Sequence, residues 1–289
     1  MTARTKPLVI AIDGPSGSGK SSVSRAVAQR LDLAYLDTGA MFRALTWWCA
    51  QTGVNLDDQS AVAGAARDLP LQMGTDPSSP SVWVGGVVID EAIRTSEISE
   101  SVSKVATNLE VRAELRDRQR ALIADSVENS GGVVAEGRDI TTVVAPHADV
   151  RILLVANQKA RLARRAKELH GDSDHAAVDA THDQISTSRS DDVAVVQALE
   201  LLNGEEFNRR VALGTLDQEL SQEPEWPRIV TRAYWATLGR APTPKELGAG
   251  NQFMQAAPGV TLVDNSDLDF EQSVDAVLGI VATRTGCKA

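Results

Sequence analysis

A glycine-rich segment near the start of the chain has the residue types and spacing that bind a nucleoside triphosphate. Gly14, Gly19, Lys20 and Ser21 satisfy the pattern G-x4-G-K-[ST], between an apolar run and a stretch with helical periodicity. Glycines let backbone N–H groups turn toward phosphate oxygens, and the start of the following helix adds positive charge. The lysine can reach the β- and γ-phosphates, and the serine hydroxyl can ligate Mg²⁺. The segment assigned to the nucleotide comprises Gly14, Pro15, Ser16, Gly17, Ser18, Gly19, Lys20, Ser21 and Ser22.

Several arginines downstream are suited to phosphate groups, which a guanidinium binds in a bidentate manner. Arg43 follows the second apolar run, and the pair Arg138-Asp139 follows the third. Arg164 and Arg165 lie three and four positions after Arg161, so all three share one face of a predicted helix, where like charges repel. This spacing favours a face that closes on a polyphosphate. A solvated basic face remains the alternative.

The elements that must position these residues are short buried strands separated by helices. Continuous apolar runs of this kind are typical of strands covered on both faces of a parallel sheet. The runs are 8–13, 33–37, 132–135, 150–156 and 260–263, with helical periodicity over 21–31 and 105–126. The alternation predicts an α/β fold with a parallel sheet, whose ligand site lies beyond the carboxyl ends of the strands.

Two segments depart from this alternation. Between 73 and 89 the residues after a Pro/Ser-rich turn predict a small hairpin over 82–88, which would project from the sheet domain. From 188 to 253 the pattern is helical and rich in aromatic side chains, which predicts an insertion between the fourth and fifth strands. Those aromatic residues would form a satellite core or, alternatively, dock a partner.

The composition limits the class of protein. The chain has 289 residues, 43% of them hydrophobic, and a net charge of −10, which argues against a nucleic-acid-binding surface. The two cysteines, Cys49 and Cys287, are too few for a disulfide framework and predict a core thiol and a tail thiol in a reducing compartment. Because no apolar run approaches a membrane span, we expect a cytoplasmic protein, not bound to a membrane. The four histidines lack metal-ligand spacing and receive no role.

With these residues in view, the chain resembles the bacterial cytidylate kinases, which make CDP from CMP and ATP. The similar stretches cover 8–185 and roughly 255–281, and include VIAIDGPSGSGKSSVSRAVAQRL, YLDTGAMFRA, VVAEGRDITTVVAPHADVRILLVA and GVTLVDNSDLDFEQSVDAVLGIV. The resemblance implies a P-loop nucleoside-monophosphate kinase fold: a five-stranded parallel sheet flanked by helices, a small monophosphate-binding insert and a lid. It implies a kinase core of 1–187 with 254–289, in which 73–95 lie within the insert. Phe42 stands where the family usually has tyrosine.

The resemblance also implies roles for individual residues. The cytosine edge would be read by Ser103, Arg112 and Asp139, and the CMP phosphate would be held by Arg43 and Arg138. Thr38 and Asp192 would also bind the acceptor. The transferring phosphoryl group would be neutralised by Lys20 and the lid arginines Arg161, Arg164 and Arg165, with Mg²⁺ accompanying ATP at Ser21. The predicted substrates are ATP and CMP or dCMP, for a chain expected to be a monomer.

The resemblance breaks at the end of the lid. Ser188 replaces the arginine of a family motif, Val195 replaces a later basic residue, and Arg189 is one residue out of register. We therefore keep a second hypothesis, an ATP-binding but catalytically impaired kinase-like protein. Two further alternatives remain: a kinase for another small molecule, and a non-catalytic nucleotide-binding protein.

Overall fold

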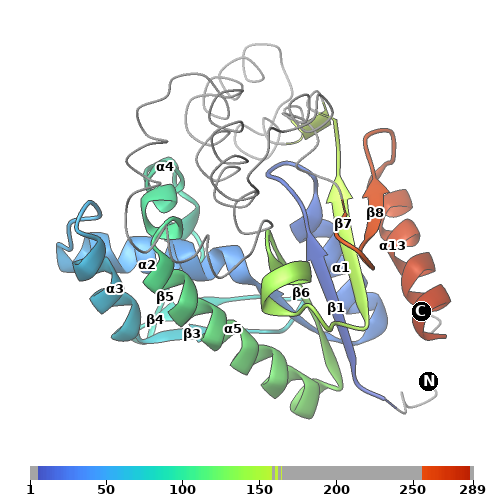
Figure 1. The fold of residues 1–289 in the computed structure, drawn as a ribbon, viewed down its shortest axis with the longest axis horizontal. Helices are drawn as coiled ribbons and strands as arrows, with labels where there is room; N and C mark the ends of the chain where they lie inside the picture. Colours follow the sequence, from blue (N-terminus) through green and yellow to red (C-terminus); the bar gives the residue numbers. More distant parts are fainter. Residues whose placement is uncertain (1–5, 158–159, 162–163, 165–255, 287–289) are drawn as a thin grey trace, which may run out of the picture. The chain divides into compact units, whose positions relative to one another are not determined.

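The main sheet has five strands, all parallel, in the order β2-β6-β1-β7-β8 (Figure 1). A computed structural model describes residues 6–157, 160–161, 164 and 256–286. The strands are β1 (Leu8–Asp13), β2 (Ala34–Asp37), β6 (Gly132–Gly137), β7 (Val150–Val155) and β8 (Thr261–Asp264). Each predicted strand is present, and the fold class is confirmed. The core strand β1 pairs with β6 on one side and with β7 on the other.

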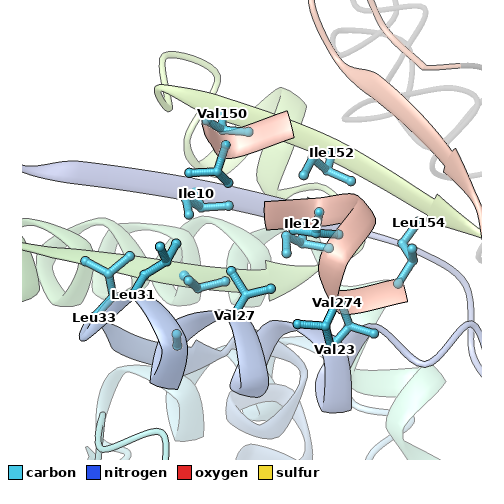
Figure 2. Close-up of a cluster of buried hydrophobic side chains, with 14 of the residues drawn as sticks. Ile10, Ile12, Val23, Val27, Leu31, Leu33, Val150, Ile152, Leu154 and Val274 are labelled. Atoms are coloured by element: carbon cyan, nitrogen blue, oxygen red, sulfur yellow. The ribbon is translucent and has the colours of Figure 1, made fainter. Parts of the chain in front are cut away.

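Helices cover both faces of this sheet. On one face, α1 (Lys20–Leu31) and α13 (Phe270–Thr285) pack against β1 and β7 through apolar side chains (Figure 2). Ile10, Ile12 and Ile152 are fully buried in that cluster, which also contains Val23 and Val274. On the other face, Leu122 and Ile123 of α5 (Leu109–Ser130) pack against residues of β2, β6 and β1. Burial on both faces explains why the strands are continuous apolar runs.

A smaller layer is built by the residues between β2 and α5. It contains helices α2 (Thr38–Thr52), α3 (Gln59–Arg67), η1 (Ala92–Arg94) and α4 (Ser96–Ala106). Its three-stranded antiparallel sheet consists of β3 (Leu71–Met73), β4 (Val82–Val84) and β5 (Val87–Val88). The predicted hairpin over 82–88 is confirmed, with Gly85 and Gly86 at positive φ in its turn. The sequence prediction missed β3 because three residues are too short for a visible alternation.

The helix predicted over 105–126 was wrong at its start. Helix α4 ends at Ala106, and the side chain of Asn108 accepts hydrogen bonds from the backbone N–H groups of Glu110 and Val111, capping α5. Asparagine favours such a cap, which divides the apparent periodic stretch into two helices. The break places Ser103 on α4 and Arg112 on α5.

Two remaining expectations concern cysteine chemistry and membranes. Cys49 is a buried free thiol, packed in the apolar cluster of the smaller layer, and Cys287 lies outside the described residues. No helix within the described residues is both long and apolar enough to cross a bilayer. The predicted helical insertion over 188–253 also lies outside the described residues.

Candidate functional site

The glycine-rich loop joins the carboxyl end of β1 to the start of α1. Gly17 and Gly19 have φ angles of 77° and 82°, in the left-handed region that glycine adopts without strain. A Cβ at Gly17 would lie 2.6 Å from the carbonyl oxygen of Arg161, so the loop also has no room for a side chain there. Because α1 begins at Lys20 with glycine as its N-cap, its first backbone N–H groups are left for an anion.

The lysine of the loop pairs with a carboxylate that sequence analysis did not single out. The Nζ of Lys20 lies 3.3 Å from Oε2 of Glu136, whose side chain is 1% exposed at the end of β6. The hydroxyl of Tyr35 on β2 donates to Oε1 of Glu136 at 3.0 Å, and the hydroxyl of Thr38 donates to the Glu136 carbonyl oxygen at 2.8 Å. Burial and the charge of Glu136 raise the pKa of Tyr35, which keeps its hydroxyl a donor. The chain thus holds Lys20 at the carboxyl edge of the sheet.

A second carboxylate stands beside this pair. Asp37 is the ladder partner of Glu136 on β2, and its Oδ1 accepts from the backbone N–H of Ala40 at 3.0 Å, capping α2. Burial raises the pKa of Asp37, and the neighbouring charge of Glu136 raises it further. The sequence alone marks Asp37 and Glu136 only weakly as functional residues, because an acidic residue at the end of a strand is also common as a helix cap.

The residues predicted to bind the acceptor lie on α2, α4, α5 and the turn after β6. Nη1 of Arg43 donates to the hydroxyl of Ser99 at 2.8 Å and to the carbonyl oxygen of Ile93 at 3.2 Å. Nη2 of Arg112 lies 2.6 Å from Oδ2 of Asp139, so the structure brings these two predicted residues together from α5 and the turn after β6. Both side chains are only partly exposed, at 16% and 22%.

Ser103 and Arg138 are two further residues predicted to bind the acceptor. The hydroxyl of Ser103 reaches the carbonyl oxygen of Glu100 within its own helix, at 3.5 Å. Arg138 is exposed at the turn that follows β6. The negative charge of Asp139 opposes the lowering of the Arg138 pKa, so Arg138 lies within electrostatic reach of the Arg112–Asp139 pair.

Asp13, the last residue of β1, fixes the turn that carries Asp139. Its carboxylate accepts from the backbone N–H groups of Ile140 and Thr141 at 2.8 Å and 2.9 Å, and from the Thr141 hydroxyl at 2.5 Å. These donors belong to η2 (Ile140–Val144), a single π-helical turn. Burial raises the pKa of Asp13 to about 6, although the bonds from Thr141 and Ile140 oppose the shift. In the sequence, Asp13 is recognisable only as the last residue of a predicted strand.

The lid arginines begin a helical stretch after β7. Arg161 is half-buried, and its backbone carbonyl faces Gly17 of the loop. The guanidinium of Arg164 donates to the carbonyl oxygens of Ser18, Asn265 and Leu268, and to Oδ1 of Asn265. It therefore binds the nucleotide loop at the carbonyl oxygen of Ser18. Arg165 and Asp192 lie outside the described residues.

Comparison with known proteins points to a single family. The family model described as cytidylate kinase matches residues 10–211, which extends past the predicted start of the insertion at 188. The chain is 51% identical over 170 residues to a cytidylate kinase of Streptomyces avermitilis, covering 58% of this chain and 72% of the relative. It is 50% identical over 179 residues to a cytidylate kinase of Streptomyces coelicolor, covering 62% and 76%. It is also 45% identical over 166 residues to a bifunctional pantoate ligase/cytidylate kinase of a Synechococcus strain, covering 57% and 33%.

Proposed function

The chain belongs to the cytidylate kinase family, and we propose that it transfers the γ-phosphoryl group of ATP to CMP and dCMP, forming CDP and dCDP. One observation carries the assignment beyond the family match. The lysine of the nucleotide loop and the Arg112–Asp139 pair lie at the carboxyl edge of one sheet, Lys20 against Glu136 and Asp139 three residues later. The site proposed for ATP therefore lies next to the site proposed for the base of CMP. The second site offers a hydrogen-bond donor, Arg112, and a hydrogen-bond acceptor, Asp139.

The donor half of the site is assigned to the loop from Gly14 to Ser22. ATP would bind with its phosphates on the loop N–H groups and on Lys20, which would leave Glu136 for the phosphate oxygens. Lys20 and Arg161 would then neutralise charge as the phosphoryl group moves to an acceptor that is already an anion, so no strong general base is required. Arg164, which was predicted to share this role, would act through the loop instead, because its guanidinium donates to backbone carbonyl oxygens. Positioning and electrostatics would supply the rate enhancement.

Mg²⁺ is proposed to accompany the nucleotide, with Ser21 as its protein ligand. The donor set fits a hard cation that prefers oxygen, because the Ser21 hydroxyl opens α1 and two carboxylates end the neighbouring strands. Oε2 of Glu136 is buried and has the Lys20 ammonium, 3.3 Å away, as its ion-pair partner. If Lys20 turned to the phosphates, this oxygen would be left for the cation. When bound, the ion would add positive charge to the phosphates.

The acceptor half is assigned to residues of the smaller layer and of the turn after β6. Arg43 and Arg138 would hold the CMP phosphate, with Thr38 beside them. Arg112 would donate to the cytosine ring, while Asp139 would accept from its amino group, and Ser103 would complete this edge. Arg165 and Asp192 keep the roles that the family resemblance implies for them.

The domain arrangement is likewise a proposal: a kinase core of 1–187 with 254–289, and an insertion over 188–253. It is supported by β8, which pairs with β7 in parallel and therefore needs a crossover connection between them. We propose that the chain is active as a monomer, because residues assigned to ATP and to CMP lie at one edge of the same sheet. Its net charge of −10 supports small nucleotides, not nucleic acids, as partners.

The test is a coupled ADP-release assay with ATP, Mg²⁺ and CMP, dCMP, UMP or AMP on the full chain. We expect release with CMP and dCMP at least about tenfold above that with UMP and AMP, expressed as kcat/KM. Preference for UMP, AMP or none of the four would contradict the assignment. ATP binding without transfer to any acceptor would favour the impaired kinase-like protein.

A further inference from the structure

The carbonyl oxygen of Ser18, inside the nucleotide loop, receives two hydrogen bonds from distant parts of the chain. Nδ2 of Asn265 donates to it at 2.9 Å, and Nη1 of Arg164 donates at 3.3 Å. Asn265 follows β8 and is 1% exposed, and Arg164 belongs to the helical stretch after β7. We propose that Asn265 and Arg164 are positioning residues for ATP, because they fix the orientation of the Ser18–Gly19 peptide.

The geometry of the peptide group connects these bonds to the phosphate site. A trans peptide is planar, and its C=O and N–H point in opposite directions. Holding the Ser18 oxygen against Asn265 and Arg164 therefore directs the Gly19 N–H away from them. Gly19, at φ 82°, has no Cβ to resist rotation of this peptide. Without the two donors, the peptide would be free to turn its oxygen toward the phosphates, where it would repel them.

The backbone and side chain of Asn265 are themselves fixed by hydrogen bonds to neighbouring residues. Its backbone N–H donates to the carbonyl oxygen of Val155 at 2.8 Å, which ties it to the end of β7. Its Oδ1 accepts from Arg164 at 3.0 Å, and its Nδ2 also lies 3.4 Å from the hydroxyl of Ser273 on α13. Each polar group of the buried amide thus has a partner, and its orientation is fixed.

Arg164 reinforces the same arrangement from the other side. Its Nη2 donates to the carbonyl oxygens of Asn265 at 2.7 Å and Leu268 at 3.3 Å. One guanidinium therefore binds the nucleotide loop and the segment after β8 together. Charge assistance makes such bonds stronger than those between neutral groups.

The test compares Asn265→Asp with Asn157→Asp, the same substitution at an exposed residue after the neighbouring strand. Asp at 265 replaces the Nδ2 donor with an oxygen that faces the Ser18 oxygen. For Asn265→Asp we expect the Kd for ATP, measured directly, and the KM for ATP to rise by about tenfold or more, as the loss of an oriented hydrogen bond predicts. The KM for CMP should stay within about twofold, and Asn157→Asp should change neither constant by more than that.

Folding is checked by thermal melting without nucleotide. If Asn265→Asp does not fold, Arg164→Gln takes its place, and we expect the Kd for ATP to rise by about threefold or more. An unchanged Kd for ATP in a variant that melts cooperatively would overturn the proposal, and so would an equal rise in the KM for ATP and CMP. This proposal rests on the proposed function in one respect only, that ATP is the phosphoryl donor. The direct Kd needs no acceptor, so failure of CMP phosphorylation would be seen separately.

Discussion

At the scale of single residues, the candidate site contains one lysine that is held by a buried acid. Lys20 is 18% exposed and pairs with Glu136, which is almost fully buried. A buried carboxylate requires a partner, so this pair keeps the lysine at the sheet edge before any phosphate arrives. The phosphates of a nucleotide would then compete with Glu136 for the same ammonium group.

Replacing this lysine should remove most of the activity. For Lys20→Ala we expect kcat to fall by about 10²–10³-fold, the loss typical of one group that stabilises transition-state charge. The measurement is the coupled ADP-release assay at saturating CMP, with circular dichroism to verify the fold. Turnover at the wild-type rate in the folded variant would refute the role of Lys20.

The hydroxyl that supports Glu136 can be removed with little change in shape. Tyr35→Phe deletes the 3.0 Å hydrogen bond to Oε1 and leaves a buried acceptor unsatisfied. We expect the free energy of unfolding to fall by about 1–3 kcal/mol, measured by urea denaturation. Thr283→Val, at an exposed hydroxyl on α13, is the control and should change it by less than about 0.5 kcal/mol. Equal effects of the two variants would contradict this account of Glu136.

At the scale of elements, the nucleotide loop and the helical stretch at Arg161 fit closely at one glycine. Gly17→Ala would place a Cβ 2.6 Å from the Arg161 carbonyl oxygen, at a φ of 77° that alanine disfavours. We expect the Kd for ATP to rise by about tenfold or more, because the loop or the lid helix must shift. Isothermal titration with ATP measures this rise, and a Kd equal to that of the wild type would show that the fit is not required.

The control for Gly17→Ala is the same substitution at Gly279 in α13. Gly279 is helical and has open space around a Cβ, so Gly279→Ala should leave the Kd for ATP unchanged. It should also raise the free energy of unfolding by about 0.5–1 kcal/mol, because alanine loses less backbone entropy in a helix than glycine. A destabilised Gly279→Ala variant would show that α13 is packed differently from this description.

The sequence predicted the strands and the nucleotide loop better than it predicted side-chain contacts between distant residues. Apolar runs located all five strands, because burial on both faces leaves a local pattern, and the nucleotide loop was found because its motif is contiguous. The contacts of Asp13 with Thr141, of Lys20 with Glu136 and of Asn265 with Ser18 join residues far apart in the chain. No local pattern marks such pairs. Arg112 and Asp139 were named together only through the family resemblance.

At the scale of the whole molecule, one buried acid should make stability depend on pH. Burial raises the pKa of Asp13 to about 6 in the folded protein, above the 3.8 of an ordinary aspartate. The folded state therefore binds this proton more tightly than the unfolded state. The contribution of Asp13 to the free energy of unfolding is fully present below about pH 4. It is lost as the pH rises through about 6, which lowers the free energy of unfolding by roughly 1–3 kcal/mol.

The comparison that isolates this effect is wild type against Asp13→Asn, which does not titrate. We expect the difference in the free energy of unfolding between the two proteins to change by roughly 1–3 kcal/mol in favour of the variant from pH 4.5 to pH 7.5, measured by urea denaturation. Asp37 titrates in both proteins and cancels in the difference. Parallel pH profiles would mean that Asp13 is not the group responsible.

The bonds between Arg164 and Asn265 close a loop in the chain, since the two residues are 101 positions apart. The entropy lost on closing a flexible loop grows only with the logarithm of its length, by about 0.6 kcal/mol for each doubling. In the unfolded chain, bringing together two residues 101 positions apart therefore costs little more closure entropy than bringing together two residues at half that separation. The distance in sequence between Arg164 and Asn265 is thus a small obstacle to the bonds by which both side chains hold the Ser18 carbonyl oxygen.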